Sequence, residues 1–182
     1  FCPSDVPGAL GASAELPRYG LQPMTIASGV CGLALKKDLE QDDGTVRHQY
    51  TTGFPAPGML ACSFDPDLIF SVGKAIGREM QEYGVAFCLA PGCALQRTPF
   101  DAVSQESWSE DPVLTGLCAL FFCKGVQTHG AAILRTGTLP RTLDIRLSSL
   151  RDIYALPFEI AASACKAALL PDSIVNGEAL GE

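Results

Sequence analysis

The sequence predicts an α/β fold in which parallel strands alternate with helices. Two helix starts share one pattern: Asp65-Pro66 and Asp111-Pro112 each place a capping carboxylate before a proline at the first helical position. Residues 85–89 form an uninterrupted apolar run, which is typical of a strand buried on both faces. Apolar runs of this kind alternate with helical patterns along the chain, and this order indicates a parallel sheet.

The front of the chain gives the first strand and helix. We expect an irregular lead-in over residues 1–23, a strand at 24–27 and a long polar surface loop over 36–53. The first helix begins at Asp65 and ends at Gly84, with apolar residues every three to four positions along one face.

The same alternation continues in the second half. After the strand at 85–89, a second helix runs from Asp111 to Gly130 and leads into a strand at 131–134. A third helix is expected with a serine cap at Ser148 or Ser149 and a kink or split at Pro157. A final short strand is expected at 167–170.

Four strands are too few for a closed eight-stranded barrel. Two architectures therefore remain open, an open doubly wound sheet and about half of a barrel. The sequence contains neither G-x-G-x-x-G after its first strand nor G-x-x-x-x-G-K-[ST], so the nucleotide-binding form of the open sheet loses its main support.

Composition limits the classes of partner. The formal net charge is -7 and the pI about 4.8, which argues against nucleic acid as a partner because phosphate binding needs clustered lysine and arginine. No apolar run approaches the ~20 residues that span a bilayer, and the first residues do not resemble a secretion signal. We therefore expect no nucleic-acid and no membrane partner.

The chain has eight cysteines, and none of them forms a C-x-x-C pair. Cys88, Cys118, Cys123 and Cys165 fall in apolar strand or helix patterns, so we expect buried free thiols, with disulfides or a metal site as alternatives. Free thiols fit a reducing compartment and predict a cytoplasmic protein. No metal and no cofactor are expected.

Several short motifs occur together in a fixed order. The most specific are Ser109-Glu110-Asp111-Pro112 and Gly125-Val126-Gln127, accompanied by Phe54-Pro55, by Arg97-Thr98-Pro99 and by Val175-Asn176-Gly177-Glu178. Over residues 17–177 this series resembles the N-terminal barrel domain of glycoside hydrolase family 3, the β-glucosidase family. The resemblance implies a (β/α)₈ barrel, of which residues 1–182 would form one partial domain, roughly the first half.

The resemblance also says where catalysis would occur. The family's catalytic Asp lies on a later strand in a Ser-Asp-Trp-like segment, and its general acid comes from a further region. Nothing in the 182 residues corresponds to either, so no catalytic residue is assigned. We expect a truncated and degenerate carbohydrate hydrolase that is inactive by itself.

Sugar-binding positions of the family would follow the strand ends. After residue 27 the family carries an Asp that holds sugar hydroxyls, whereas this chain has Ser28, and Ala34 stands where an Arg often follows. In the family's Gly-Arg-x-x-Glu segment, Val103 replaces the Arg and Glu106 keeps the acid. A neutral hydroxyl does not replace a charged bidentate acceptor.

Two further strand ends complete the candidates. The family's Lys-His pair corresponds to Arg135-Thr136, or to Thr136-Gly137 if no gap is placed, and its Ser-Tyr-Asn loop corresponds to a segment containing Asp172. The weak substrate-binding candidates are therefore Ser28, Glu106, Arg135 and Asp172, and the ligand would be a β-glucoside or oligosaccharide. The alternatives are a pseudo-enzyme that binds carbohydrate or protein, and a hydrolase part completed by another chain. Open barrel edges predict self-association or a covering partner.

Overall fold

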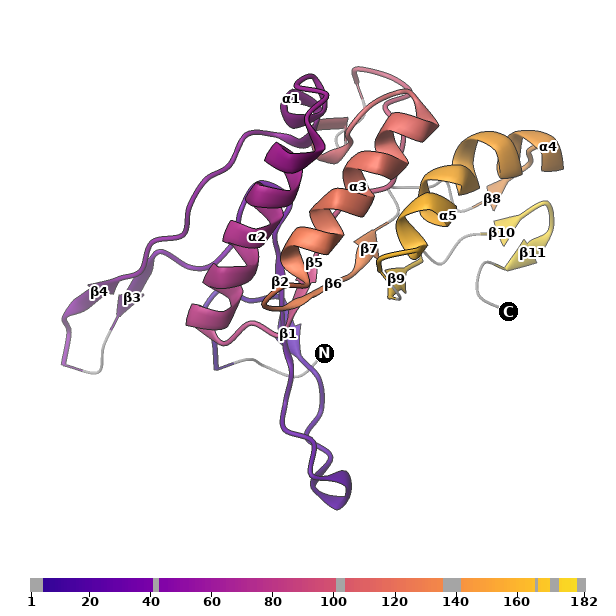
Figure 1. Cartoon of the computed structure of the whole chain (residues 1–182). Coiled ribbons are helices and arrows are strands. Elements are labelled where there is room, and N and C mark those ends of the chain that lie inside the picture. Colours follow the sequence, from indigo (N-terminus) through magenta and orange to yellow (C-terminus); the bar gives the residue numbers. More distant parts are fainter. Residues whose placement is uncertain are drawn as a thin grey trace.

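The computed structural model places a four-stranded sheet at the centre of the chain, in the order β1-β2-β5-β6. These strands are Gly11–Ala12, Thr25–Ser28, Phe87–Leu89 and Ala131–Ala132. β2, β5 and β6 are parallel, which confirms the predicted strand series, and helices α2, α3 and α5 lie side by side along the sheet (Figure 1). The structure describes residues 5–40, 43–100, 104–135, 142–165, 167–170 and 174–179.

The lead-in contains more structure than the sequence predicted. β1 pairs antiparallel with β2, and a 3₁₀ helix at Pro17–Tyr19 forms the end of an extended arm below the sheet (Figure 1). The prediction of a wholly irregular segment was wrong because a two-residue edge strand leaves almost no periodic signal.

The two capped helices match their prediction closely. In α2, Pro66–Tyr83, the Asp65 side chain accepts hydrogen bonds from the backbone N–H groups of Asp67 and Leu68 at 2.9 and 3.1 Å. Gly84 ends α2 in a left-handed conformation with φ of 71°. None of the helices in the described ranges is long and apolar enough to cross a membrane.

The second helix, α3, spans Pro112–Val126 and is capped by Asp111, which accepts a hydrogen bond from Leu114 N at 2.7 Å. The core lies between the helices and the sheet. Its largest fully buried side chains include Ile76 and Met80 from α2, and Phe122 and Val126 from α3. In α2, the apolar residues at every third to fourth position therefore marked the buried face.

The third helical segment is composite. It consists of α4 at Leu147–Ser149, a π-helical turn at Leu150–Ala155 and α5 at Leu156–Ala162. The predicted serine cap was wrong, because the chain enters α4 from Arg146 and no side chain caps it. The predicted kink or split appears as a change of helix type: the chain stays helical from Leu147 to Ala162, and the π-helical turn gives way to α5 in the turn that contains Pro157.

The polar segment 36–53 was predicted as a surface loop but contains a hairpin. β3, Asp38–Glu40, pairs antiparallel with β4, Val46–His48, and the hairpin extends away from the sheet (Figure 1). His48 Nδ1 lies 2.7 Å from Asp38 Oδ1 across the two strands. A short helix, α1 at Pro57–Ala61, follows and was also not predicted.

The last strands form two further small sheets, β7-β9 and β11-β10-β8. β7, Leu134–Arg135, pairs in parallel with β9, Ala168–Leu169, which confirms the predicted strand at 167–170. β10, Ile174–Val175, pairs with β8, Thr142–Leu143, and with β11, Glu178–Ala179.

Candidate functional site

Three parallel strands bring their carboxyl ends to one edge of the structure. β2 ends at Ser28, which is paired in register with Leu89 at the end of β5. The chain then continues through Pro91, whose carbonyl accepts a hydrogen bond from Arg135 N at 2.9 Å. Cys93 N in turn donates to Arg135 O at 2.8 Å. The backbone around Arg135 is therefore fixed to the segment that follows β5.

Two of the predicted binding residues meet at this edge. Arg135 Nη2 lies 2.6 Å from Glu106 Oε2, and their side chains are 25% and 38% exposed. Glu106 lies in a 3₁₀ helix, Ser104–Glu106, that packs on the backbone of Gly92. A Cβ at Gly92 would lie 2.8 Å from Glu106 O, so the close approach needs a glycine there.

The Arg135–Glu106 ion pair is partly open to solvent, and this exposure limits its contribution to stability and leaves hydrogen-bonding groups accessible. An ion pair at this exposure contributes about 1 kcal/mol or less to stability, because water screens both charges. The guanidinium has five N–H donors, and the carboxylate accepts more than one hydrogen bond. Groups on both partners therefore remain available to a hydroxyl-bearing ligand.

Ser28 belongs to the same edge but is not a charged group. Its side chain is half-buried, and its backbone carbonyl accepts a hydrogen bond from Ala34 N at 2.9 Å. The loop between them carries Cys31, whose pKa is raised by burial and then by the negative charge of Glu106. The Cys31 thiol therefore lies within electrostatic range of Glu106.

Two predicted positions lie outside the described residues. Asp172 and Val103 fall in the ranges 171–173 and 101–103, and the structure does not test them. Ala34, the position that was compared with a frequent Arg of the family, is exposed on the loop after β2. The structure thus brings Glu106 and Arg135 together and places Ser28 on a neighbouring strand end.

Sequence reasoning missed the residue that positions the Glu106 loop. Gln96 Nε2 donates to Ser107 O at 2.9 Å and to Ser104 O at 3.3 Å, so its amide holds both ends of the short 3₁₀ helix. A lone glutamine beside a polar loop gives no sequence signal, because its partners are backbone carbonyls set by the tertiary fold.

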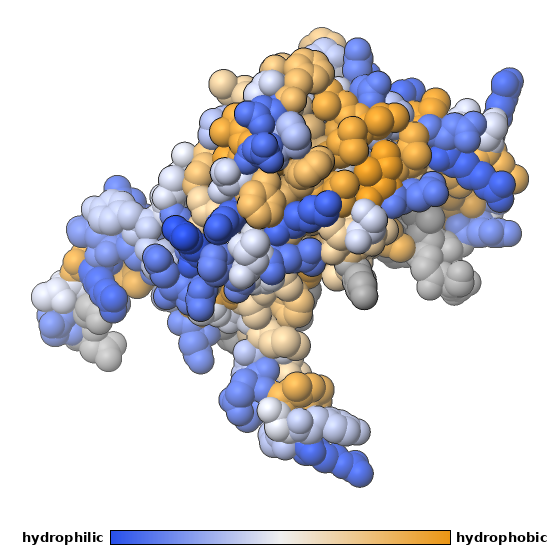
Figure 2. All heavy atoms as spheres, viewed as in Figure 1, coloured by the Kyte–Doolittle hydropathy of each residue, from blue (hydrophilic) through white to orange (hydrophobic). Residues whose placement is uncertain are grey.

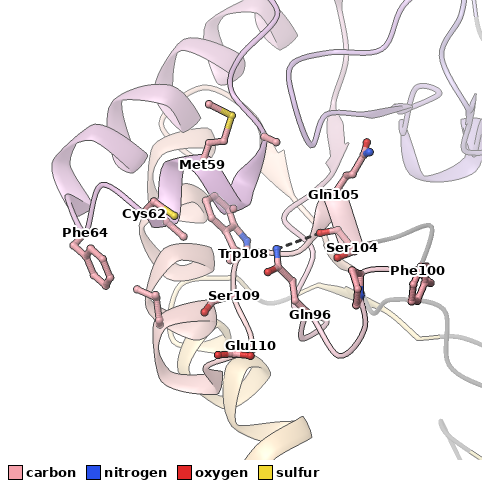
Figure 3. A pocket seen from close by; sticks show the side chains of 15 residues that line it. Met59, Cys62, Phe64, Gln96, Phe100, Ser104, Gln105, Trp108, Ser109 and Glu110 are labelled. Atoms are coloured by element: carbon pink, nitrogen blue, oxygen red, sulfur yellow. Dashed lines mark hydrogen bonds between the residues drawn. The ribbon is translucent and has the colours of Figure 1, made fainter.

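A cleft of about 840 Å³ opens beside this loop (Figure 3). Met59, Phe64, Gln96 and Trp108 are among its lining residues, whereas Ser28, Glu106 and Arg135 are not. Trp108 is 2% exposed and packs edge-on against Phe122, and its buried Nε1 has no hydrogen-bond partner among the residues that the structure describes. The cleft therefore lies next to the strand-end site without being part of it.

The residues that the structure describes contain no arrangement of side chains suited to bind a metal ion. No group of three or more His, Cys, Asp or Glu side chains in those ranges is arranged to hold an ion. His129, one of the two histidines, is exposed just beyond α3. The described part of the site therefore offers one cation, one carboxylate and a hydroxyl.

Comparisons with known proteins place this architecture among carbohydrate hydrolases. Residues 21–138 match the profile of the glycosyl hydrolase family 3 N-terminal domain. The chain is 30% identical over 169 residues to probable β-glucosidase J of Neosartorya fischeri, covering 84% of this chain and 20% of that protein. It is 31% identical over 160 residues to thermostable β-glucosidase B of Acetivibrio thermocellus, covering 82% and 21%.

Solved structures agree with the sequence comparison. β-Glucosidase 3B from Thermotoga neapolitana, solved in complex with glycerol, superposes with a TM-score of 0.87 at 35% identity. The match covers 96% of this chain and 26% of that one. The chain thus spans between a fifth and about a quarter of the length of these relatives, and the likeness confirms the predicted partial α/β barrel.

Proposed function

The chain belongs to glycosyl hydrolase family 3, and we propose that its 182 residues bind a β-glucoside weakly without hydrolysing it by themselves. The β-glucosidases that it matches support a β-glucoside as the ligand class. Hydrolysis needs two carboxyl groups on either side of the scissile bond. At the strand-end edge the described residues supply one carboxylate, Glu106.

The contact between Arg135 and Glu106 carries this proposal. Each charged group already satisfies part of the other's hydrogen-bonding capacity at 2.6 Å. A guanidinium that is held by a carboxylate is a weaker general donor to a sugar than a free ammonium group, and Arg and Lys are not interchangeable in this role. Ser28, a neutral group at the neighbouring strand end, adds at most one hydroxyl contact.

Glycosidase assays test the catalytic half of the proposal. The purified chain is incubated with an aryl β-glucoside, and release of the aryl alcohol is followed against a blank without protein. We expect no release above the blank. Turnover that co-purifies with the chain and disappears in Glu106→Gln would overturn this half, because Glu106 would then be taking part in catalysis.

Titration calorimetry tests the binding half separately. We expect weak heats with glucose in the millimolar range, reduced in Arg135→Ala and Glu106→Gln, and unchanged in Glu110→Gln. Glu110 is an exposed acid at the start of α3 and serves as the matched control. Identical heats in all four proteins, or none in the parent chain, would remove the sugar-binding role.

A second function is favoured by an apolar surface. Val113 and Leu117 of α3 are 47% and 41% exposed, and Figure 2 shows an apolar area over α3 and α5. A helix that is apolar on all sides is normally buried on all sides. We therefore keep the alternative that another chain, or a second copy, covers this surface and completes a hydrolase.

Light scattering distinguishes this alternative from the first proposal. A stable dimer, or a complex with a separately supplied family 3 fragment that gains turnover, would support completion by another chain. A monomer over the whole accessible concentration range that stays inactive with that fragment would contradict it.

The cytoplasmic location remains a prediction. The seven described cysteines are free thiols, as expected of a protein in a reducing compartment.

A further inference from the structure

The cleft beside the Glu106 loop has an exposed apolar lining. Met59, Phe64 and Phe100 line it and are 70%, 75% and 94% exposed. A concave surface with apolar and aromatic walls and a few polar groups is typical of a small-molecule site. Among the described lining residues, Glu110 is the one charged side chain, and it is an acid. The lining therefore favours an uncharged, apolar ligand over an anion.

Trp108 lies at the inner wall of this cleft and holds an unused hydrogen-bond donor. The residue is 2% exposed, and its Nε1–H has no acceptor among the described residues. On the core side, the indole packs edge-on against Phe122, with ring centroids 5.9 Å apart. A buried N–H without an acceptor lowers stability because it has given up its hydrogen bond to water. An acceptor atom supplied by a ligand would remove that cost.

The chain on either side of Trp108 is fixed in place. Gln96 Nε2 donates to Ser107 O at 2.9 Å, and Gln96 N donates to Ser109 O at 3.0 Å. From α1, a Cβ at Gly58 would lie 3.7 Å from Trp108 O, which is ordinary van der Waals contact. Figure 3 shows the nitrogen edge of the indole on the side of Gln96, which also lines the cleft. The donor is therefore held between α1 and the segment 96–109.

We propose that this cleft binds an uncharged aromatic molecule with a carbonyl oxygen, which accepts a hydrogen bond from Trp108 Nε1. The ring of the ligand packs against Phe64 at the wall of the cleft. The N–H lies beneath the surface, so the oxygen reaches it after a side chain of the wall changes rotamer. Met59 is unbranched and largely exposed, and such side chains change rotamer within nanoseconds. This ligand class differs from the β-glucoside proposed for the strand-end site.

The single tryptophan makes the proposed hydrogen bond observable by NMR. The ¹⁵N-labelled chain gives one indole N–H resonance, which is followed during titration with acetophenone, an aromatic ketone. Ethylbenzene, of similar size and shape but without the oxygen, is the matched probe. We expect acetophenone to move the indole proton downfield to saturation and to bind about 3–10-fold more tightly than ethylbenzene, the factor for one net hydrogen bond. An unmoved resonance up to the solubility limit of acetophenone, or equal affinity for the two probes, would overturn the proposal.

Two exposed thiols locate the bound molecule. Cys62 lines the cleft, whereas Cys31 lies on the loop after β2, and both are free. Brief alkylation with iodoacetamide followed by trypsin reads them separately, because peptide 48–74 contains Cys62 alone and peptide 19–36 contains Cys31 alone. Acetophenone should slow alkylation of Cys62 several-fold and leave Cys31 unchanged. Equal slowing at both thiols, or none at Cys62, would place the ketone elsewhere and refute the assignment.

A pair of matched variants tests the aromatic wall. Phe64→Leu removes an exposed ring from the cleft, and Tyr19→Leu removes a ring of similar exposure, 71%, from the arm below the sheet. Loss of one aromatic contact should weaken acetophenone binding about 2–10-fold in Phe64→Leu and leave Tyr19→Leu at the parent affinity. Because both side chains are largely exposed, neither change removes core packing. Equal affinities in the three proteins would contradict the proposed binding site.

A second copy of the chain is the competing occupant of the cleft. Without ketone, the alkylation rate of Cys62 should be the same in dilute and in concentrated protein. A rate that falls as the protein concentration rises, with Cys31 unaffected, would assign the cleft to self-association and would overturn the small-molecule site.

Discussion

A close approach between the two long helices makes one sharp prediction, for Gly73→Ala. A Cβ added at Gly73 of α2 would lie 2.5 Å from Phe122 O and 3.2 Å from Val126 N of α3, whereas ordinary contact starts at 3.4 Å. The nearest atom belongs to helix backbone, which cannot rotate away. The two helices must therefore separate locally by roughly 0.9 Å, and a gap of that size forfeits about a quarter to a half of each facing dispersion contact.

The expected change in the free energy of unfolding for Gly73→Ala is the sum of two destabilising contributions and one stabilising contribution. Overpacking of this kind costs about 1–3 kcal/mol, and the lost contacts of the neighbouring buried side chains add about 1 kcal/mol more. Alanine regains about 1 kcal/mol of helix propensity over glycine. We expect Gly73→Ala to lower the free energy of unfolding by about 1–3 kcal/mol.

Urea denaturation measures this difference directly. The fluorescence of Trp108, the single tryptophan and a buried one, reports unfolding of the helix layer. The midpoint should fall while the slope with denaturant stays unchanged. Gly53→Ala is the control, because a Cβ there meets nothing within 4 Å. A Gly73→Ala midpoint equal to or above that of Gly53→Ala would refute the close-packing argument.

Three further changes test single contacts. Asp111→Ala removes the cap on Leu114 N and should cost about 1 kcal/mol in urea denaturation, while Glu110→Ala should cost far less; equal losses would contradict the capping role. Gln96→Leu should speed amide exchange of residues 104–107 relative to a Gln105→Leu control, since Gln96 holds Ser104 O and Ser107 O; unchanged protection would show that the amide is not needed. Hydrogen bonds from Thr45 lower the pKa of Asp43 below 3.8, so the turn gains stability that is fully present above pH 3.8 and is lost as pH falls through the lowered value. A carboxyl NMR titration of Asp43 with a midpoint at or above 3.8 would contradict this, and Thr45→Ala should move the midpoint upward.

At the strand-end site, the sequence predicted the positions of Glu106 and Arg135 but not the contact between their side chains. Glu106 and Arg135 were each selected because they occupy strand-end positions of a family pattern, and the structure places both at one edge. Their mutual contact was not predictable, because it depends on how the 3₁₀ helix at 104–106 packs against Gly92. Side-chain pairing across loops is decided by tertiary packing and leaves no periodic trace in the sequence.

The sequence by itself determined the elements whose hydrogen bonds are local. Asp65 and Asp111 cap helices through bonds to residues within three positions, and Gly84 ends α2 because it accepts a left-handed conformation. The β3–β4 hairpin escaped prediction because its short strands are exposed and carry no alternating apolar pattern.

Only the tertiary structure decided which distant residues meet. The packing of α3 against α2 and α5 brings Gly73 to the backbone of α3 and Gln127 Nε2 to within 2.9 Å of Ala164 O. The parallel register of β2 and β5 sets Ser28 beside Leu89 at the site edge. Such contacts join residues tens of positions apart, and their geometry follows from how the helices and strands pack together rather than from any local sequence pattern.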